Sequence, residues 1–178
     1  KRGAQQGMDV VIVSGDKDFA QLVSDRIRMF DPMRDVTYDA ELVRKKWGVR
    51  PDQIVDLFAL MGDAIDNIPG VSGIGQKGAA TLLEKYGSVE AIYASLGELK
   101  GKQKASLEAG RESARISREL ATIDCAVPVV EAIESFAIAP PDDATLNALY
   151  KELEFYSLLR GDSPELNSGA GAGGAVEY

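Results

Sequence analysis

The chain has 178 residues, of which 45% are apolar, so it can bury the core of one medium-sized domain. It has no histidine, which excludes imidazole metal sites and Ser-His-Asp triads and leaves carboxylates as the main candidates for metal or acid–base chemistry. The formal net charge of −8 argues against indiscriminate binding to nucleic acid, but a local basic patch or a bound divalent cation can reverse the field at one site.

Cysteine content and apolar runs bear on the compartment. The single cysteine, Cys125, cannot form an internal disulfide, which suits a reducing cytosol, and we expect it to be a small core residue. The longest apolar runs, such as VVIV at 10–13, are far too short to span a membrane, and we find no targeting leader. We therefore expect a cytoplasmic protein with no membrane partner.

The first 38 residues have the pattern of part of an α/β unit. KRGAQQG reads as the end of a helix, VVIV as a fully buried strand and KDFAQLV as the start of the next helix. A uniformly apolar strand favours parallel neighbours and helices on both faces of its sheet. RIRMFDP and DVTYD, around a turn at Pro32, are expected to add short strands. Because few such strands are present, we expect the carboxyl-terminal remnant of a larger parallel sheet, truncated at its amino terminus.

After Tyr38 the pattern becomes mainly helical. Five helical stretches are predicted: TYDAELVRKKWG closed by Gly48, RPDQIVDLFALMGD, GQKGAATLLEKYG, SVEAIYASL capped by Ser88, and DDATLNALYKELEFYSLL. A long basic segment, KGKQKASLEAGRESARISRELATI, is also predicted to be helical. The Gly/Ala-rich end, residues 161–178, is predicted to be a flexible linker.

A glycine turn, GVSGIGQKGAA, lies between two of these helices. Glycines at 73 and 75 permit positive φ and close approach of a ligand, and the free amides of the following helix favour an anion. Lys77 adds a positive charge, and Ile74 is expected to anchor the turn in the core. We predict that a nucleic-acid phosphate binds at Ser72, Gly73, Ile74, Gly75, Gln76 and Lys77. The alternative is a helical hairpin with a purely structural role.

Two pairs of aspartates are candidate metal ligands. Asp16 and Asp18 follow the VVIV strand, at the end of the sheet where open α/β folds place ligands, although they can also be read as a helix cap and a loop charge. Asp63 and Asp66, three residues apart, are expected to share a face at the end of a helix, where their repulsion suggests a compensating cation. Four carboxylates without histidine or thiolate select Mg²⁺ or Mn²⁺.

These residues resemble a known family, the 5′-nuclease domains of bacterial DNA polymerase I within the wider flap endonuclease group. The matching stretches are VVIVSGDKDFAQLVSD, residues 38–93, LKGK at 99–102, SRELATI at 117–123 and LEFYSLL at 153–159. GDAIDNIPGVSGIGQK at 62–77 is the most specific, because its aspartates and its turn have the family's spacing. The similarity covers nearly all of residues 8–160.

The resemblance implies a fold and a set of roles. It implies the end of a parallel-sheet α/β nuclease core over 1–38, followed by a helical duplex-DNA-binding region over 39–160 with a helix-three-turn-helix motif. Asp16, Asp18, Asp63 and Asp66 match the ligands of one of two divalent metals, and the carbonyls of Gly70 and Val71 match a potassium site. The implied partners are duplex DNA with a 5′ flap or 5′ end, the amino-terminal nuclease half and downstream polymerase domains.

The sequence departs from the family in one respect and leaves alternatives open. Acidic ligands that family members carry in an amino-terminal half are not in this sequence, so we expect little or no cleavage by this chain alone. Basic clusters, among them Lys102 on LKGK and the helically spaced Arg111, Arg115 and Arg118, are candidate phosphate contacts or solvated faces. Besides a 5′ nuclease, two hypotheses remain: a non-catalytic helix-hairpin-helix DNA-binding module, and a phosphatase-like enzyme suggested by SGDKD.

Overall fold

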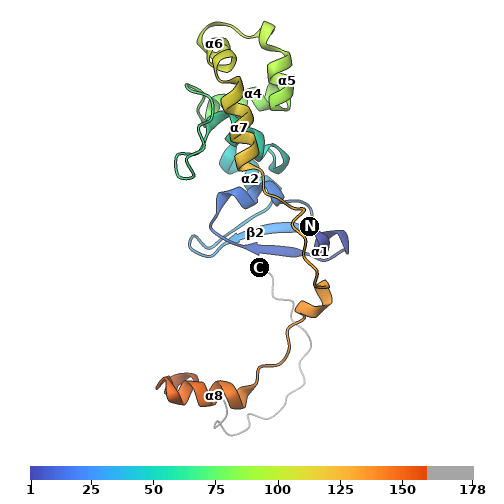
Figure 1. Ribbon diagram of the computed structural model, residues 1–178, viewed down its shortest axis with the longest axis vertical. Coiled ribbons are helices and arrows are strands. Elements are labelled where there is room, and N and C mark those ends of the chain that lie inside the picture. The colour runs from blue at the N-terminus through green and yellow to red at the C-terminus, as the bar shows by residue number, and fades with distance from the viewer. Residues whose placement is uncertain (160–178) are drawn as a thin grey trace. The chain divides into compact units, whose positions relative to one another are not determined.

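The computed structural model describes residues 1–159 of the chain, and the predicted linker at 161–178 lies outside the described residues. The chain divides into two units, Lys1–Val129 and a second that begins at Val130. Figure 1 shows the strands of the first unit at one end and helices α4 to α7 at the other. The first unit therefore holds both the sheet and the glycine turn.

The sheet has three short strands in the order β1-β2-β3: β1 Val10–Val13, β2 Ile27–Asp31 and β3 Val36–Tyr38. β1 and β2 are parallel, with Val10 opposite Ile27, and β2 and β3 are antiparallel. A short helix α1, Arg2–Gln5, precedes β1, and a 3₁₀ segment η1, Lys17–Leu22, connects β1 to β2. The two strands predicted around Pro32 are confirmed, and the antiparallel β3 makes the sheet mixed rather than wholly parallel.

The prediction that β1 is fully buried is wrong. Its residues alternate, with Val11 50% and Val13 65% exposed. β1 is the edge strand of the described sheet, and no element of the first unit covers the face that carries these two valines. The alternation of exposed and half-buried residues along β1 therefore indicates a strand that is covered on one face only. Cys125, expected in the core, is also exposed.

The helices of the first unit follow the predicted order. They are α2 Ala40–Trp47, η2 Pro51–Gln53, α3 Ile54–Met61, α4 Gln76–Tyr86, α5 Val89–Ala94, η3 Leu96–Glu98, α6 Gly101–Ala109 and α7 Arg111–Ala121. Ser88 caps α5 as predicted, because its side chain accepts a hydrogen bond from the Ala91 amide. The long basic segment is two helices, α6 and α7, separated at Gly110.

Helix α3 is the centre of the core. Its sequence IVDLFALM is apolar almost all round, as expected for a buried helix, and α4 and α7 pack against it. Its one buried charge, Asp56, accepts a hydrogen bond from the Val89 amide at the start of α5 (3.0 Å) and pairs with Arg118 of α7 (2.9 Å). Burial raises the pKa of Asp56, although both partners oppose that rise. The Asp56 carboxylate thus connects helices α3, α5 and α7.

The second unit, described as far as residue 159, contains the 3₁₀ segments η4 Ile133–Phe136 and η5 Tyr156–Leu158 and helix α8 Asp143–Glu152. Asp142 caps α8 by accepting a hydrogen bond from the Thr145 amide (3.1 Å). About half of the surface of Leu149, in α8, and of Leu153, just after it, remains exposed. Over the described part of the chain, no helix has the length and apolar character needed to cross a membrane.

Candidate metal centre and nucleic-acid interface

The loop after β1 places the first pair of aspartates. Asp16 is the N-cap of η1, because its Oδ1 accepts a hydrogen bond from the Asp18 amide (3.0 Å). The backbone is extended at Asp16 and becomes helical from Lys17 onward. Asp16 therefore has the capping contact that was the alternative interpretation.

The second pair lies on a tight loop, so its predicted position at a helix end is wrong. Helix α3 ends at Met61, and Gly62, with φ of 72°, turns the chain away from the helix. Asp63 and Ile68 then exchange two backbone hydrogen bonds of 2.8 Å, which close the loop. Asp63 Oδ1 also accepts a hydrogen bond from the Ile65 amide (3.1 Å). Loop closure, not helical periodicity, determines where these carboxylates point.

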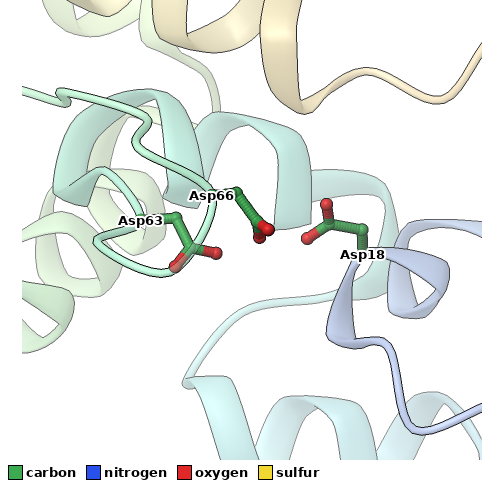
Figure 2. A group of neighbouring side chains, drawn as sticks. All are labelled: Asp18, Asp63 and Asp66. Atoms are coloured by element: carbon green, nitrogen blue, oxygen red, sulfur yellow. The ribbon is translucent and has the colours of Figure 1, made fainter.

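Three of the four predicted aspartates come together. One carboxylate oxygen each from Asp18, Asp63 and Asp66 lies within 4.8 Å of the others, and Figure 2 shows the three side chains converging from the start of η1 and from the loop after α3. Asp16 is not in this group, although it lines a cavity next to it together with Asp66. Asp18 Oδ1 is buried and accepts no hydrogen bond from the described residues. Such an oxygen is costly to bury unless a cation or a donor faces it.

A lysine that the sequence analysis did not select offsets part of the negative charge of this cluster. Lys17 Nζ forms ion pairs with Asp63 and, at 3.0 Å, with Asp66. Burial lowers the pKa of Lys17, but the hydrogen bonds and charges of Asp63 and Asp66 outweigh it and raise the pKa above its ordinary value. The sequence signal was present, because SGDKD places a cationic side chain between the two aspartates.

The carboxylates differ in their electrostatic environment. Burial raises the pKa of Asp63, but hydrogen bonds from Lys17 and the Ile65 amide and the charge of Lys17 bring it below its usual range. Burial and the charge of Asp16 raise the pKa of Asp18, with partial opposition from Lys17. Closely spaced oxygen donors with unbalanced negative charge fit a hard divalent cation. The residues present therefore suit the metal that the sequence predicts.

The glycine turn is built on close backbone packing. Gly70 has φ of 63°, and a Cβ added there would lie 2.3 Å from the Gly62 nitrogen. The Ile74 side chain is 7% exposed, so it anchors the turn in the core as predicted. Of the two glycines expected to use positive φ, Gly73 does (83°), whereas Gly75 is extended with φ of −94° and is the N-cap of α4. A Cβ at Gly75 would meet no atom within 4 Å, so the start of α4 is open to a ligand.

Helix α7 fixes the turn through two serines. The buried Ser117 hydroxyl accepts a hydrogen bond from the Gly70 amide (2.8 Å), and the Ser113 hydroxyl donates one to the Gly70 carbonyl (2.5 Å). The Val71 carbonyl accepts a hydrogen bond from the Ile74 amide (3.0 Å). Both carbonyls predicted to hold potassium thus already accept one internal hydrogen bond, and each retains a second lone pair.

The other residues predicted to contact DNA differ in exposure and in their hydrogen-bond partners. Ser72, Lys77 and Lys102 are exposed. Gln76 has a structural partner, since its side-chain amide donates hydrogen bonds to the carbonyls of Lys46 (3.1 Å) and Trp47 (3.3 Å) at the end of α2. These bonds connect the start of α4 to the helix that borders the acidic loop.

The arginines of α7 share a surface pocket with α5 but are not a row of free cations. Arg115 pairs with Glu112 (2.8 Å) and Glu119 (3.3 Å), and Arg118 pairs with Asp56 and Glu90. Arg111 lies over the Tyr93 ring, 4.6 Å from its centroid. For Arg115 and Arg118, pairing with carboxylates favours a structural interpretation over a phosphate contact.

Fold and site together define the class of protein: a small α/β sheet joined to a helical hairpin, with an acidic cation site between them. The family model described as "5′-3′ exonuclease, C-terminal SAM fold" matches residues 49–144. DNA polymerase I of Bacillus caldotenax is 44% identical over 163 residues, which cover 89% of this chain and 19% of that protein. A 5′-3′ exonuclease of Aquifex aeolicus is 39% identical, with 88% of this chain and 53% of that protein covered.

Solved structures agree with these sequence matches. A zinc-bound T5 5′-exonuclease is 31% identical with a TM-score of 0.58, over 62% of this chain and 42% of that chain. A T5 D15 flap endonuclease complex with DNA and metal ions is 29% identical with a TM-score of 0.61, over 67% of this chain and 45% of that one. The chain belongs to the 5′-3′ exonuclease family, which confirms the resemblance and the predicted fold class. It spans about a fifth of the Bacillus polymerase and about half of the Aquifex exonuclease.

Proposed function

We propose that this chain is the carboxyl-terminal part of a structure-specific 5′ nuclease, the 5′-3′ exonuclease or flap endonuclease domain of a DNA polymerase I that acts in replication and repair. The observation that carries the proposal is the convergence of Asp18, Asp63 and Asp66, because one short segment, residues 62–77, links these carboxylates to the open start of α4. The 5′-3′ exonuclease and DNA polymerase I relatives support a hydrolytic activity on DNA. The family match favours this hypothesis over the phosphatase-like one.

The carboxylates would hold Mg²⁺ or Mn²⁺. Asp18, Asp63 and Asp66 would supply direct ligands, and Asp16, on the neighbouring cavity wall, would add negative charge or orient ligands. When bound, the metal lowers the pKa of a water molecule and stabilises charge on the leaving oxygen during phosphodiester hydrolysis. Lys17 would have to leave its position between Asp63 and Asp66, since an ammonium and a divalent ion compete for the same oxygens.

The glycine turn would hold the DNA duplex. The uncapped amides at the start of α4 favour an anion, and the exposed Lys77 in the first turn of α4 adds a positive charge. Ile74 and the Ser117 hydrogen bond would keep the turn rigid while phosphate binds. Because phosphates carry no base code, binding would depend on salt and on DNA structure more than on sequence. The distance between turn and carboxylates would then select the bond next to a 5′ end or flap.

Potassium would bind at the carbonyls of Gly70 and Val71, beside a cavity of about 600 Å³ that Gly70, Ser72, Ser106 and Ser113 line. Carbonyl and hydroxyl oxygens are suitable ligands for such a cation, and it would face a phosphate of the duplex. The amino-terminal nuclease half and downstream polymerase domains are the proposed partners. Catalysis would require that half, because it carries further acidic ligands in the family, so the chain alone should bind DNA with little or no cleavage.

Titration with Mn²⁺ tests the metal centre. The chain and a variant with Asp63→Asn and Asp66→Asn are compared by calorimetry, with Asp35→Asn as a control at an exposed loop position. We expect the double variant to lose at least tenfold in Mn²⁺ affinity and the control to lose none. Equal affinity in all three proteins would favour the competing hypothesis, a DNA-binding hairpin module whose aspartates are caps and surface charges.

A second experiment tests the nuclease assignment itself. The amino-terminal half of a related 5′-3′ exonuclease is added to this chain, and cleavage of a 5′-flap DNA is measured with Mg²⁺. We expect cleavage with the unmodified chain and none with the Asp63→Asn, Asp66→Asn variant. A complex that forms but never cleaves would contradict the enzymatic hypothesis.

A further inference from the structure

A cavity of about 430 Å³ lies beside the acidic cluster, on the side of helix α2. Its walls include Asp16 and Asp66 from the two acidic loops, the cations Lys17, Arg34 and Lys46, and Trp47. It is distinct from the glycine turn, whose residues 70–77 do not line it. A cavity lined by both cations and candidate metal ligands is suited to an anion once a metal has neutralised those ligands.

The three cations differ in the partners that they already have. Arg34 pairs with the buried Asp31 (2.7 Å), and Lys17 pairs with Asp63 and Asp66. Lys46 forms no ion pair with any carboxylate of residues 1–159. Of these three cations, Lys46 is therefore the one that an incoming anion can bind without breaking a salt bridge.

Aromatic rings hold Lys46 in place. Its Nζ lies 4.3 Å from the ring centroids of both Tyr38 and Trp47, and it donates a hydrogen bond to the Tyr38 hydroxyl (2.7 Å). The two rings lie 5.5 Å apart, and both side chains are buried. An ammonium has three donors, so two remain for a ligand. A lysine fixed in this way loses little conformational entropy when it binds a phosphate.

We infer that Lys46 is a phosphate-binding residue, and that the cavity takes a phosphate of the DNA strand beside the metal centre. The inference rests on the proposed nuclease function and adds to it a contact on α2, separate from the glycine turn. Gln76 supports it structurally, because its hydrogen bonds to the Lys46 and Trp47 carbonyls connect the cavity wall to the start of α4. One strand could thus be held at two points by a rigid scaffold.

DNA binding by the unmodified chain, Lys46→Met, Lys46→Arg and Lys45→Met tests the inference. Lys45 is the matched control, since it is exposed in the same last turn of α2 and does not line the cavity. Binding of a duplex with a 5′ end is measured over a range of salt concentrations, with Ca²⁺ replacing Mg²⁺. We expect Lys46→Met to weaken binding about three- to tenfold and to reduce the salt slope by about 0.9, the value of one phosphate contact.

The controls define the outcomes. Lys46→Arg, which keeps the charge, should retain most of the affinity, and Lys45→Met should match the unmodified chain. Affinity of Lys46→Met within twofold of the unmodified chain, or an equal loss in Lys45→Met, would overturn the inference and leave the proposed function standing. If the unmodified chain itself shows no salt-dependent DNA binding, both are overturned.

Trp47 supplies a second readout, because it is the only tryptophan in the chain. An anion bound at the Lys46 ammonium should change the electric field at the adjacent indole and therefore its fluorescence, so DNA should alter emission in the unmodified chain and less in Lys46→Met. Inorganic phosphate at the same phosphate concentration should produce less than a tenth of that change. An equal response to inorganic phosphate would overturn the assignment to a DNA strand.

Discussion

The two ends of the segment from Gly62 to Lys77 are held in different ways. At the acidic end, Asp63 and Asp66 meet Asp18 from a distant loop, and a lysine ammonium balances their charge. At the other end, the turn at Gly70 is held by backbone packing against Gly62 and by a buried serine. The first end carries ionised side chains paired with a cation on a loop closed by backbone hydrogen bonds, whereas the second is held by close backbone packing and by hydrogen bonds with uncharged serine hydroxyls.

This difference shows how the segment can combine two tasks. A site that binds a metal has to exchange one cation for another, so its charges must be accessible and its counter-ion displaceable. A turn that receives a phosphate benefits from being formed in advance, because it then loses little entropy on binding. Variants at the turn should therefore change stability most, and variants at the acidic end should change metal binding and pH dependence.

The largest effect is expected for Gly70→Ala. The new Cβ would lie 2.3 Å from the Gly62 nitrogen at a φ of 63°, so both sterics and backbone strain oppose it. We expect the free energy of unfolding to fall by about 3 kcal/mol or more. Urea unfolding measures it, with Gly75→Ala as the control, because a Cβ there meets nothing within 4 Å. Equal stability of the two variants would contradict the account of the turn.

Ser117→Ala should have the next largest effect. Ser117 is fully buried, and its loss leaves the Gly70 amide without an acceptor, which costs about 1–3 kcal/mol of unfolding free energy. Ser113→Ala is the matched control on the same helix, where the partner is a carbonyl and the site is only partly buried, so we expect a smaller loss. If Ser113→Ala destabilised the protein more than Ser117→Ala, the turn would depend on its carbonyl instead.

Lys17→Met probes the acidic end. Without metal, the loss of the ammonium from Asp63 and Asp66 should lower the free energy of unfolding by about 1 kcal/mol. In the same variant, Mn²⁺ should bind several-fold more tightly, because a competing cation is gone. Calorimetry and denaturation measure the two effects, with Lys104→Met, whose ion pair with Glu108 is a long 3.8 Å, as the control. Unchanged or weaker Mn²⁺ binding would show that Lys17 does not compete with the metal.

The smallest effect is a pH dependence at the same end of the sheet. A hydrogen bond from Arg34 holds the pKa of Asp31 below its usual range, so its folded-state pKa lies below the unfolded value of about 3.9. This carboxylate therefore stabilises the fold above about pH 4, and the contribution is lost as the pH falls through the folded pKa. The stability difference between the chain and Asp31→Asn should shrink in that window.

Two controls accompany this pH series. Asp35→Asn, at an exposed position, and Ser117→Ala, at the turn, should run parallel to the unmodified chain at every pH. A difference that stayed constant for Asp31→Asn from neutral pH to pH 2 would show that its charge adds no stability. Convergence of the Ser117→Ala curve at low pH would place titrating groups at the turn and weaken the contrast between the two ends.

Much of the fold follows from local patterns. The strands around Pro32, the helix after Asp39, the cap at Ser88 and the anchoring role of Ile74 were all predicted, because each depends on a residue's own preference or on its near neighbours. The burial of β1 was not predicted correctly, since VVIV reads the same whether one face or both are covered. The break at Gly110 was missed because an isolated glycine inside a helical stretch does not by itself end a helix.

For the candidate site as well, the sequence predicted some features and the tertiary structure decided others. The sequence by itself determined which residue types are available to the proposed site, because the lack of histidine leaves the aspartates as candidate metal ligands and the glycines before a helix as a candidate anion-binding turn. Only the tertiary structure decided that Asp18 joins Asp63 and Asp66 while Asp16 caps η1, that Lys17 balances them, and that Lys46 faces a cavity without a carboxylate partner. These facts depend on which distant loops meet, and long-range packing sets that meeting, not the spacing of residues along the chain.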